Sequence, residues 1–467
     1  MAEINADNLH RLAKEAIDSG RARTVDEAIE LLGGYRLCVI FEASDDPIAH
    51  ATLLTAVALG SRVFLGGVTV SGKLDVPQVS CLPEGPLLAD AVVALGGRLG
   101  EPDADTPTIT IGLDAAGKRQ ATFHVRAVWQ GWRGGVLPID TADSITPATA
   151  MPLAGMLAAA LAVSEAFRFV SGRAHAAGLS PVGLSLWSPG SDWIGAGADD
   201  PILNYLPSRL WLIGLGHLGQ AYLWAIGLLP YANPGDVELV LQDVDRIGAS
   251  TPSTSVLSFS SMVGARKTRA MADWAERRGF ETHIHERLFD GDCRRQASEP
   301  AVALCGLDNA DGRRALNTSA FDFVVEAGLG RDFRNFQTIR LHTLPARRSA
   351  AEIWRGIPGI APSVEGNPAY RELLNSGKLD QCGMTLLAGK AVGAPFVGSV
   401  AACLVISEVL RLLAGARVNE LIDLDLRCVQ HMEVVVQDRD FSLLNPGYTF
   451  AGQDPAQSAD MESEGGR

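Results

Sequence analysis

The chain has 467 residues, which is enough for roughly two to four domains with substantial cores. Hydrophobic residues make up 47% and charged residues 20%, a globular composition that excludes a collagenous or wholly disordered chain. Forty Lys and Arg against fifty-four Asp and Glu give a net charge of −14, which repels phosphate backbones and anionic lipid headgroups. We therefore expect no nucleic-acid partner and no membrane partner.

Membrane, export and metal signals are weak in this sequence. Two uncharged apolar segments, 151–163 and 391–406, are shorter than the roughly 20 residues of a spanning helix and are expected to be buried core helices. The first twenty residues lack the apolar stretch of a secretory signal, which favours a cytoplasmic protein. The seven cysteines form no CxxC pair, which argues against a disulfide framework and against a four-thiolate zinc site.

The first part of the chain is predicted to be a small helical region, residues 1–34, followed by an α/β lobe. Thr24 and Glu27 have the spacing of a helix capping box. Residues 36–67 then show a strand, helix and strand pattern, which predicts a parallel βαβ unit. We assign residues 35–200 to this first lobe.

A second α/β lobe follows a connection rich in Gly, Ser and Pro at residues 173–207. It begins with the apolar strand pattern RLWLIG at 209–214, and we assign residues 201–440 to it. Residues 441–467 end in a polar stretch without apolar periodicity and are expected to form a disordered tail.

An internal repeat relates the two lobes. The segment at 152–172, PLAGMLAAALAVSEAFRFVSG, aligns without gaps with PFVGSVAACLVISEVLRLLAG at 395–415, and nine positions are identical. Chance similarity of two alanine-rich helices does not explain the shared Pro, Ser-Glu, Arg and Gly. The sequence therefore predicts an α/β fold with two tandem Rossmann-like lobes, of which the second is enlarged.

A glycine-rich turn marks the second lobe as the one that binds nucleotide. Gly214, Gly216 and Gly219 form GxGxxG directly after a predicted strand and before a predicted helix. Such glycines let the backbone approach a phosphate at the positive end of the helix. The matching place in the first lobe, FEASDD at 41–46, has no glycine and is acidic, so the first lobe is expected to be degenerate.

Asp243 ends the next predicted strand, VELVLQD at 237–243, where a carboxylate can accept hydrogen bonds from ribose hydroxyls. This spacing suits NAD as well as ATP. An NAD-dependent oxidoreductase therefore stays an alternative, although no hydride-transfer acid is evident. His217, inside the glycine loop, is expected to pack there and not to catalyse.

The motifs that follow Asp243 favour ATP over NAD as the nucleotide. Their order resembles the adenylation site of the ubiquitin-activating enzyme superfamily, and the resemblance covers about residues 208–415. The motifs are Asp243-Val244-Asp245, Val263-Gly264-Ala265-Arg266-Lys267, Cys305-Gly306-Leu307-Asp308-Asn309 and Arg313.

The resemblance implies a function for each matching residue. The three glycines would hold the phosphates of ATP, and Asp243 with Asp245 would hold the ribose end of the nucleotide. Lys267 would neutralise phosphate charge, and Asp308 would bind Mg²⁺. Arg313 matches the arginine of the family's D-N-x-x-x-R pattern. The alternatives without a role in nucleotide binding are that Asp308 caps a helix and that Lys267 lies on a solvent-exposed helix face.

One departure from the family is the absence of an arginine. Where the family shows S-N-x-N/Q-R, this chain has Ser-Thr-Pro-Ser-Thr at 250–254, with Thr254 in place of the arginine. The possible replacements are Arg246, Arg266 and, from the N-terminal helical region, Arg21 and Arg23.

A Gly- and Pro-rich segment, 353–382, matches the family's crossover loop, under which the tail of a ubiquitin-like protein passes. Cys382 lies at its end, where thioester-forming members carry the catalytic cysteine. Its rival is Cys293, whose neighbours Arg294 and Arg295 favour a thiolate.

The resemblance thus implies ATP-dependent adenylation of the C-terminal carboxylate of a ubiquitin-like protein, then transfer to Cys382 as a thioester and on to a conjugating enzyme. The tandem inactive and active lobes are similar to the single-chain activators of bacterial ubiquitination-like antiviral defence operons. A degenerate activator that binds a partner without turnover is the other alternative, because Thr254 removes a cation.

Overall fold

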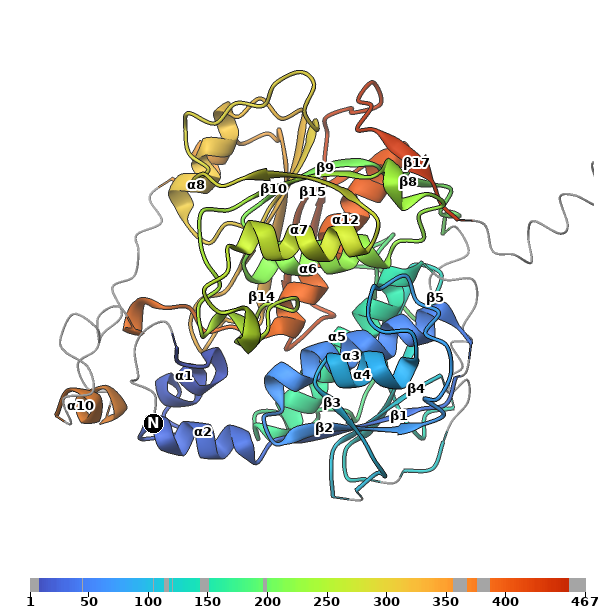
Figure 1. The fold of residues 1–467 in the computed structure, drawn as a ribbon, viewed down its shortest axis with the longest axis vertical. Coiled ribbons are helices and arrows are strands. Elements are labelled where there is room, and N and C mark those ends of the chain that lie inside the picture. Colours follow the sequence, from blue (N-terminus) through green and yellow to red (C-terminus); the bar gives the residue numbers. More distant parts are fainter. Residues whose placement is uncertain are drawn as a thin grey trace, which may run out of the picture.

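The protein consists of two α/β lobes that lie against each other, with the two N-terminal helices beside both (Figure 1). The computed structural model describes residues 8–43, 45–103, 105–112, 117–119, 121–142, 151–195, 200–355, 368–375 and 387–452. The chain begins with α1 (Arg11–Asp18) and α2 (Val25–Gly33), the latter capped by the Thr24 side chain, which accepts a hydrogen bond from the Glu27 amide at 3.0 Å.

The first lobe contains a seven-stranded sheet with the strand order β3-β2-β1-β4-β5-β6-β7. Strands β1 to β5 run parallel, and β6 and β7 are antiparallel additions. The strands are β1 (Arg36–Phe41), β2 (Gly67–Gly72), β3 (Gly97–Leu99), β4 (Thr108–Ile111), β5 (His124–Gln130), β6 (Arg133–Pro138) and β7 (Val182–Ser185), and the helices are α3 (Pro47–Val63), α4 (Leu88–Ala94) and α5 (Pro152–Val170).

The second lobe contains an eight-stranded sheet with the order β11-β10-β9-β12-β13-β14-β15-β16. Its first five strands are parallel and its last three are antiparallel additions. The strands are β9 (Arg209–Ile213), β10 (Glu238–Gln242), β11 (Glu281–His285), β12 (Val302–Cys305), β13 (Phe323–Leu329), β14 (Thr338–Leu344), β15 (Asn419–Asp425) and β16 (Glu433–Val436).

The helices of the second lobe include two long buried ones, α6 and α12. Within the described residues, the helices are α6 (His217–Leu228), α7 (Lys267–Arg277), α8 (Ala310–Ala315), α9 (Ala350–Ile353), α10 (Pro368–Asn375) and α12 (Pro395–Leu413), with the 3-10 turns η1 (Pro234–Asp236), η2 (Thr251–Ser253), η3 (Ser260–Met262) and η4 (Leu316–Thr318).

The two sheets share one topology, because the strand order of the first lobe repeats in the second with one further strand. The repeated segments form the equivalent helices α5 and α12, each of 19 residues, which pack against each other between the sheets. The predicted tandem α/β architecture is therefore confirmed. By length and composition both helices could cross a membrane, but 83% and 94% of their most apolar stretches are buried, as in core helices of folded domains.

The repeated Glu and Arg positions make equivalent ion pairs in both lobes. Arg168 pairs with Glu165 on α5, and Arg411 pairs with Glu408 on α12. Each arginine also crosses to the other lobe: Arg168 donates to the Arg427 carbonyl, and Arg411 lies over the Trp187 ring at 4.6 Å. The shared Glu and Arg of the repeat thus contribute polar contacts between the two lobes.

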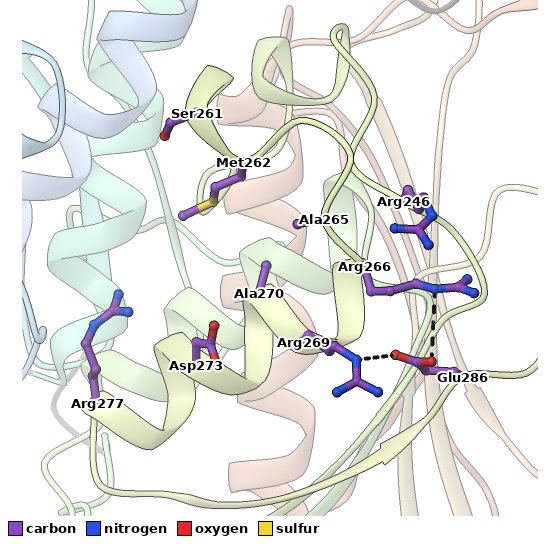
Figure 2. A pocket seen from close by; sticks show the side chains of 10 residues that line it. All are labelled: Arg246, Ser261, Met262, Ala265, Arg266, Arg269, Ala270, Asp273, Arg277 and Glu286. Carbon is purple, nitrogen blue, oxygen red and sulfur yellow. Dashed lines mark hydrogen bonds and ion pairs between the residues drawn. The ribbon is translucent and has the colours of Figure 1, made fainter.

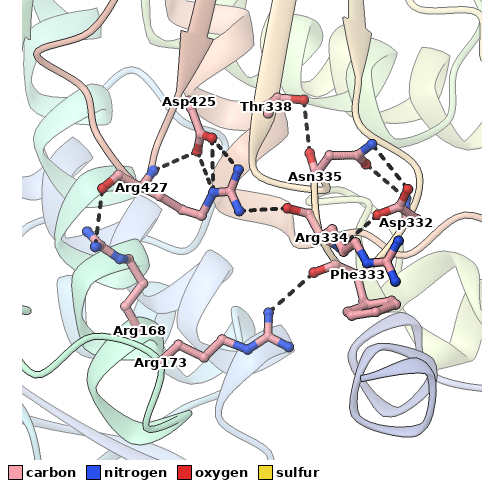
Figure 3. Close-up of polar contacts among 9 residues, drawn as sticks. All are labelled: Arg168, Arg173, Asp332, Phe333, Arg334, Asn335, Thr338, Asp425 and Arg427. Atoms are coloured by element: carbon pink, nitrogen blue, oxygen red, sulfur yellow. Dashed lines mark hydrogen bonds and ion pairs between the residues drawn. The ribbon is translucent and has the colours of Figure 1, made fainter. Parts of the chain in front are cut away.

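A second polar contact between the lobes involves the loop after β13 (Figure 3). Arg173, just beyond α5, donates to the Phe333 carbonyl at 3.4 Å. Arg427 donates to the Arg334 carbonyl at 2.7 Å and in turn receives the Arg168 contact at its own carbonyl. The first lobe therefore fixes a loop that lies next to the candidate site described below.

The C-terminal region is ordered further than the sequence indicated. The disordered tail was expected from residue 441, but β17 (Tyr448–Phe450) pairs antiparallel with β8 (Tyr205–Pro207). Tyr448 and Phe450 also contact the ring of Tyr205. The local sequence has no strand period because only three residues pair. Residues 453–467 lie outside the described residues.

Candidate nucleotide and adenylation site

The predicted site residues of the second lobe meet at one edge of its sheet. The glycine loop follows β9, Asp243 follows β10, and Asp308 lies in the loop after β12. These three strands are neighbours in the order β10-β9-β12, and all run parallel. Their carboxyl ends therefore lie side by side, at the edge where open α/β sheets bind ligands.

Each of the three positions in the loop requires or favours glycine for a different physical reason. Gly214 adopts φ +83°, a left-handed conformation that other residues rarely adopt. A Cβ atom on Gly219 would lie 1.9 Å from the Gly214 carbonyl oxygen, so this glycine permits close packing of strand and helix. Gly216 precedes α6, and no described heavy atom lies within 4 Å of an added Cβ. Gly216 thus leaves open space at the positive end of the helix.

Asp243 holds the glycine loop in place. Its Oδ2 accepts a hydrogen bond from the Leu215 amide at 2.7 Å, and its Oδ1 accepts one from the Asp245 amide at 2.7 Å. Lys267, the first residue of α7, places its Nζ 3.7 Å from Asp243 and 2.9 Å from Asp245. The side chains of Asp243 and Lys267 are 8% and 12% exposed, whereas that of Asp245 is 64% exposed. Lys267 therefore balances two carboxylates at the edge of the site.

Asp308 lies on an exposed loop and does not cap the next helix. The cap of α8 is Asn309, whose side chain accepts a hydrogen bond from the Gly312 amide at 2.7 Å. Arg331 donates to the Asp308 carbonyl at 3.4 Å, and it directly precedes Asp332 in the loop that contacts the first lobe. The Asp308 carboxylate is thus left to face solvent at the sheet edge.

Among the described residues, no three His, Cys, Asp or Glu side chains form a group that could hold a metal ion by themselves. Mg²⁺ does not require such a group, since in nucleotide sites it binds one or two carboxylates together with phosphates and water. The exposed Asp308 carboxylate and the open space at Gly216 fit this mode of binding.

Arg313 faces the interior of the lobe. Its guanidinium donates to the Leu307 carbonyl at 2.9 and 2.6 Å, pairs with buried Glu326 at 3.3 Å and lies 4.2 Å over the Trp354 ring. The structure therefore shows Arg313 fixing the residue just before Asp308. A direct contact between Arg313 and nucleotide stays a prediction.

The loop that lacks the family's arginine is held from the first lobe and from α1. Arg62 of α3 donates to the Ser255 and Val256 carbonyls at 3.2 and 2.6 Å, and burial lowers the pKa of its guanidinium to about 10. Arg11, at the start of α1, donates from Nη2 to Ser250 Oγ at 3.0 Å and from its amide to Ser253 Oγ at 3.3 Å.

Arg11 contacts this loop, although it is not among the arginines that the sequence suggested as replacements. The predicted replacements are engaged elsewhere: Arg21 binds Glu15 and Tyr35, and Arg23 is exposed near the start of α2. Arg246 and Arg266 donate to the backbone carbonyls of residues 264 and 244. No local signal in the sequence could have selected Arg11, because its contact crosses about 240 residues.

Cys382 lies outside the described residues, as does most of the predicted crossover segment. Its rival Cys293 is buried, with Sγ 3.5 Å from the Leu288 carbonyl oxygen and 3.7 Å from Gln242 Nε2. Two further cysteines, Cys305 and Cys403, are also buried, and burial raises the pKa of the Cys305 thiol to about 12 and raises the pKa of the Cys403 thiol. Buried thiols of high pKa are poor nucleophiles.

The corresponding place in the first lobe is closed. Asp46 caps α3, and its Oδ1 accepts a hydrogen bond from the Ile48 amide at 2.8 Å. The acidic side chain thus occupies the helix start that a phosphate would need. In the second lobe, His217 packs against α12, where a Cβ on Gly398 would lie 2.5 Å from its Nε2, and burial lowers the pKa of His217 to about 4. A neutral packed imidazole agrees with the prediction that His217 does not catalyse.

Comparison with known proteins assigns the two lobes to one family. The BilD N-terminal domain matches residues 35–186, and the BilD C-terminal domain matches residues 206–416. The bacterial E1-like protein BilD of Collimonas sp. (strain OK412) is 43% identical over 431 residues, which are 91% of this chain and 93% of that protein.

Solved structures show weaker similarity. E. coli MccB is 13% identical with a TM-score of 0.33, covering 71% of this chain and 93% of that chain. E. coli TcdA in complex with ATP is 15% identical with a TM-score of 0.30, covering 44% and 86%. Scores this low support no conclusion about activity. The 43% identity with BilD of Collimonas extends over 91% of this chain, and it defines the chain as an E1-like protein. The chain belongs to the BilD family of bacterial E1-like proteins.

Proposed function

We propose that the chain is an ATP-dependent adenylating enzyme that activates the C-terminal carboxylate of a ubiquitin-like protein. The observation that carries this proposal is the single sheet edge at which the glycine loop, the Asp243, Asp245 and Lys267 cluster and the Asp308 loop meet. Membership of an E1-like family supports the same activity. At the matching turn the first lobe has no glycine, and Asp46 caps α3 there, so we assign this lobe a structural role.

The chain's own residues provide the nucleotide site. The phosphates would lie at the start of α6, in the open space beside Gly216, where backbone N–H groups and the helix dipole favour negative charge. Asp243 already accepts two backbone amides, but carboxylate oxygens have further lone pairs for ribose hydroxyls. Asp308 would hold Mg²⁺, which supplies positive charge that neutralises the phosphates.

The reaction joins two anions and so depends on positive charge. The substrate carboxylate oxygen attacks the α-phosphorus, a carbonyl–oxygen–phosphorus bond forms, and the α–β anhydride bond breaks to release pyrophosphate. Lys267 lies within reach of this chemistry because its Nζ is at the site edge, 2.9 Å from the exposed Asp245 carboxylate. A phosphate could replace Asp245 as the partner of Lys267, since surface ion pairs contribute little free energy.

Arg11 is proposed to supply the charge that Thr254 lacks. It reaches the Ser250–Thr254 loop from α1, and α1 is anchored by buried Glu15, which binds Arg21 and Arg173. A cation delivered by a preformed helix needs no reorganisation when charge develops on the phosphates.

Cys382 is proposed as the acceptor of the activated acyl group. Its thiolate would attack the acyl carbon, forming a thioester and releasing AMP, after the thiol proton is lost to solvent. The alternative acceptor, Cys293, is buried, which supports the choice of Cys382. The acyl group would then pass to a conjugating enzyme, in the setting of a bacterial ubiquitination-like antiviral defence pathway in the cytoplasm.

The test is ATP–pyrophosphate exchange with a ubiquitin-like protein encoded next to this chain's gene. We expect exchange that requires Mg²⁺ and the intact C-terminal residue of that protein. Cys382→Ala should keep exchange and lose a reducing-agent-sensitive adduct on a non-reducing gel, whereas Cys293→Ala should keep both. An adduct that survives in Cys382→Ala and disappears in Cys293→Ala would reverse the assignment. NAD binding without exchange would favour the oxidoreductase instead.

A further inference from the structure

A surface groove of 680 Å³ runs along α7 and begins next to Lys267. Figure 2 shows the side chains that line it. Residues of α7 form one wall, and η3 together with the loop that follows it forms the other. The lining residues are Arg246, Ser261, Met262, Ala265, Arg266, Arg269, Ala270, Asp273, Arg277 and Glu286. The glycine loop, Asp243, Asp245, Lys267 and Asp308 do not line the groove, whereas Arg246 and Arg266, two of the arginines considered above as replacements at Thr254, do.

The groove carries excess positive charge on a chain of net charge −14. It contains four arginines and two acids. Glu286 is shared by Arg269 at 2.9 Å and Arg266 at 4.0 Å, as Figure 2 shows. Arg277 is exposed and has no ion-pair partner in the described part of the chain. Because Glu286 is shared by two guanidinium groups, positive charge in the groove is left uncompensated and favours binding of an acidic segment.

The chain's own C-terminal segment starts beside the end of α7. The Gly452 amide donates to the Pro230 carbonyl, and Tyr231 forms a β-bridge with Ala451. Arg278, the residue after Arg277, donates to the Leu229 carbonyl at 3.0 Å. The last described residue of the chain and the Arg277 end of the groove are therefore attached to the same turn after α6.

The segment beyond this point, QDPAQSADMESEGGR at 453–467, is acidic and long enough to follow the groove. It contains four acidic residues and one arginine, so its side chains carry 1 − 4 = −3. Fifteen residues can extend to about 50 Å, whereas the 11 residues of α7 span only about 16 Å. Three of the acids, Asp460, Glu462 and Glu464, fall within five residues.

We propose that residues 453–467 dock in cis along the arginine groove of α7. Tethering at the end of α7 gives the segment an effective concentration on the order of millimolar, so even a weak electrostatic contact is populated. Docking pairs the acids of the segment with Arg269 and Arg277 and covers the groove against other acidic ligands. The contact weakens with salt, because the paired groups are exposed and screening acts within about 8 Å at physiological ionic strength.

The first experiment measures binding of a fluorescent peptide of residues 453–467 to the full chain and to a chain that ends at Gly452. We expect the shortened chain to bind the peptide at least about tenfold more tightly than the full chain, whose tethered segment competes. Binding should weaken several-fold between about 50 and 300 mM NaCl. Equal binding to both chains, or none to the shortened chain, would overturn the proposal.

Two variants locate the contact. In the shortened chain, Arg269→Glu with Arg277→Glu should abolish peptide binding, whereas the control Arg340→Glu with Arg347→Glu, at similarly exposed arginines outside the groove, should not. In the full chain, neutralising Asp454, Asp460, Glu462 and Glu464 leaves the groove intact and should restore peptide binding to the level of the shortened chain. Loss of binding in the control pair, or a full chain that dimerises in light scattering through this segment, would contradict docking in cis. None of these readouts depends on adenylation.

Discussion

Gly216 and Gly219 belong to one motif but have different surroundings, which makes them a matched pair at the scale of single residues. Gly219→Ala would place a methyl group 1.9 Å from the Gly214 oxygen, and we expect it to destabilise the fold by about 3 kcal/mol and lower Tm by about 5 °C or more. Gly216→Ala meets open space and should leave Tm within about 1 °C, but weaken ATP binding roughly tenfold or more, since the methyl group enters the phosphate position. Thermal melts with ATP calorimetry distinguish the two. Equal loss of Tm in both variants would show that Gly216 only supports packing.

Asp308 is exposed, and the removal of its carboxylate should cost little stability. We expect Asp308→Ala to lose the Mg²⁺-dependent part of ATP binding and to abolish pyrophosphate exchange. Asp311→Ala is the control, because Asp311 lies three residues further, is 91% exposed and forms an ion pair with neighbouring Arg314. ATP affinity is compared in Mg²⁺ and in EDTA. An Asp308→Ala protein that still responds to Mg²⁺ as the unmodified chain does would exclude Asp308 as the metal ligand.

Helix α1 connects both lobes at the scale of elements. Its first residue, Arg11, reaches the loop of Ser250, and its buried Glu15 binds Arg173 from the first lobe. We expect Arg11→Ala to lower pyrophosphate exchange by about two orders of magnitude, the usual effect of removing a preorganised group that stabilises developing charge. Exposed Arg23 provides the control Arg23→Ala, which should keep full exchange.

A purely structural role for Arg11 makes a different prediction. Ser250→Ala removes the hydrogen bond from Arg11 but leaves its charge, and we expect this variant to keep most of the exchange activity. If Ser250→Ala and Arg11→Ala lower Tm and exchange by the same amounts, Arg11 serves only to attach α1.

At the scale of the whole molecule, the two lobes repeat one topology but differ in the turn after the first strand. The second lobe has GLGHLG and open space at Gly216, and the first has Asp46 as the cap of α3. We therefore predict one ATP per chain in calorimetry. A stoichiometry of two equivalent sites would refute the assignment of the first lobe as degenerate.

The sequence by itself determined the tandem α/β fold and the order of the nucleotide residues. These depend on local patterns: apolar strand and helix periods, glycines at a strand-to-helix turn and the 21-residue repeat. The fold class predicts that β9, β10 and β12 are neighbouring parallel strands. Since neighbouring parallel strands place their carboxyl ends together, the motifs after these strands lie at one edge of the sheet.

Only the tertiary structure decided which arginine serves which group. Arg313 fits a family pattern in the sequence, yet it turns inward to Glu326 and Trp354, while Arg11 reaches Ser250 across about 240 residues. The pairing of β17 with β8 was equally hidden, because its partner lies more than 240 residues away. A long side chain samples many partners, and its choice depends on the packing of elements distant in sequence, which no local pattern records.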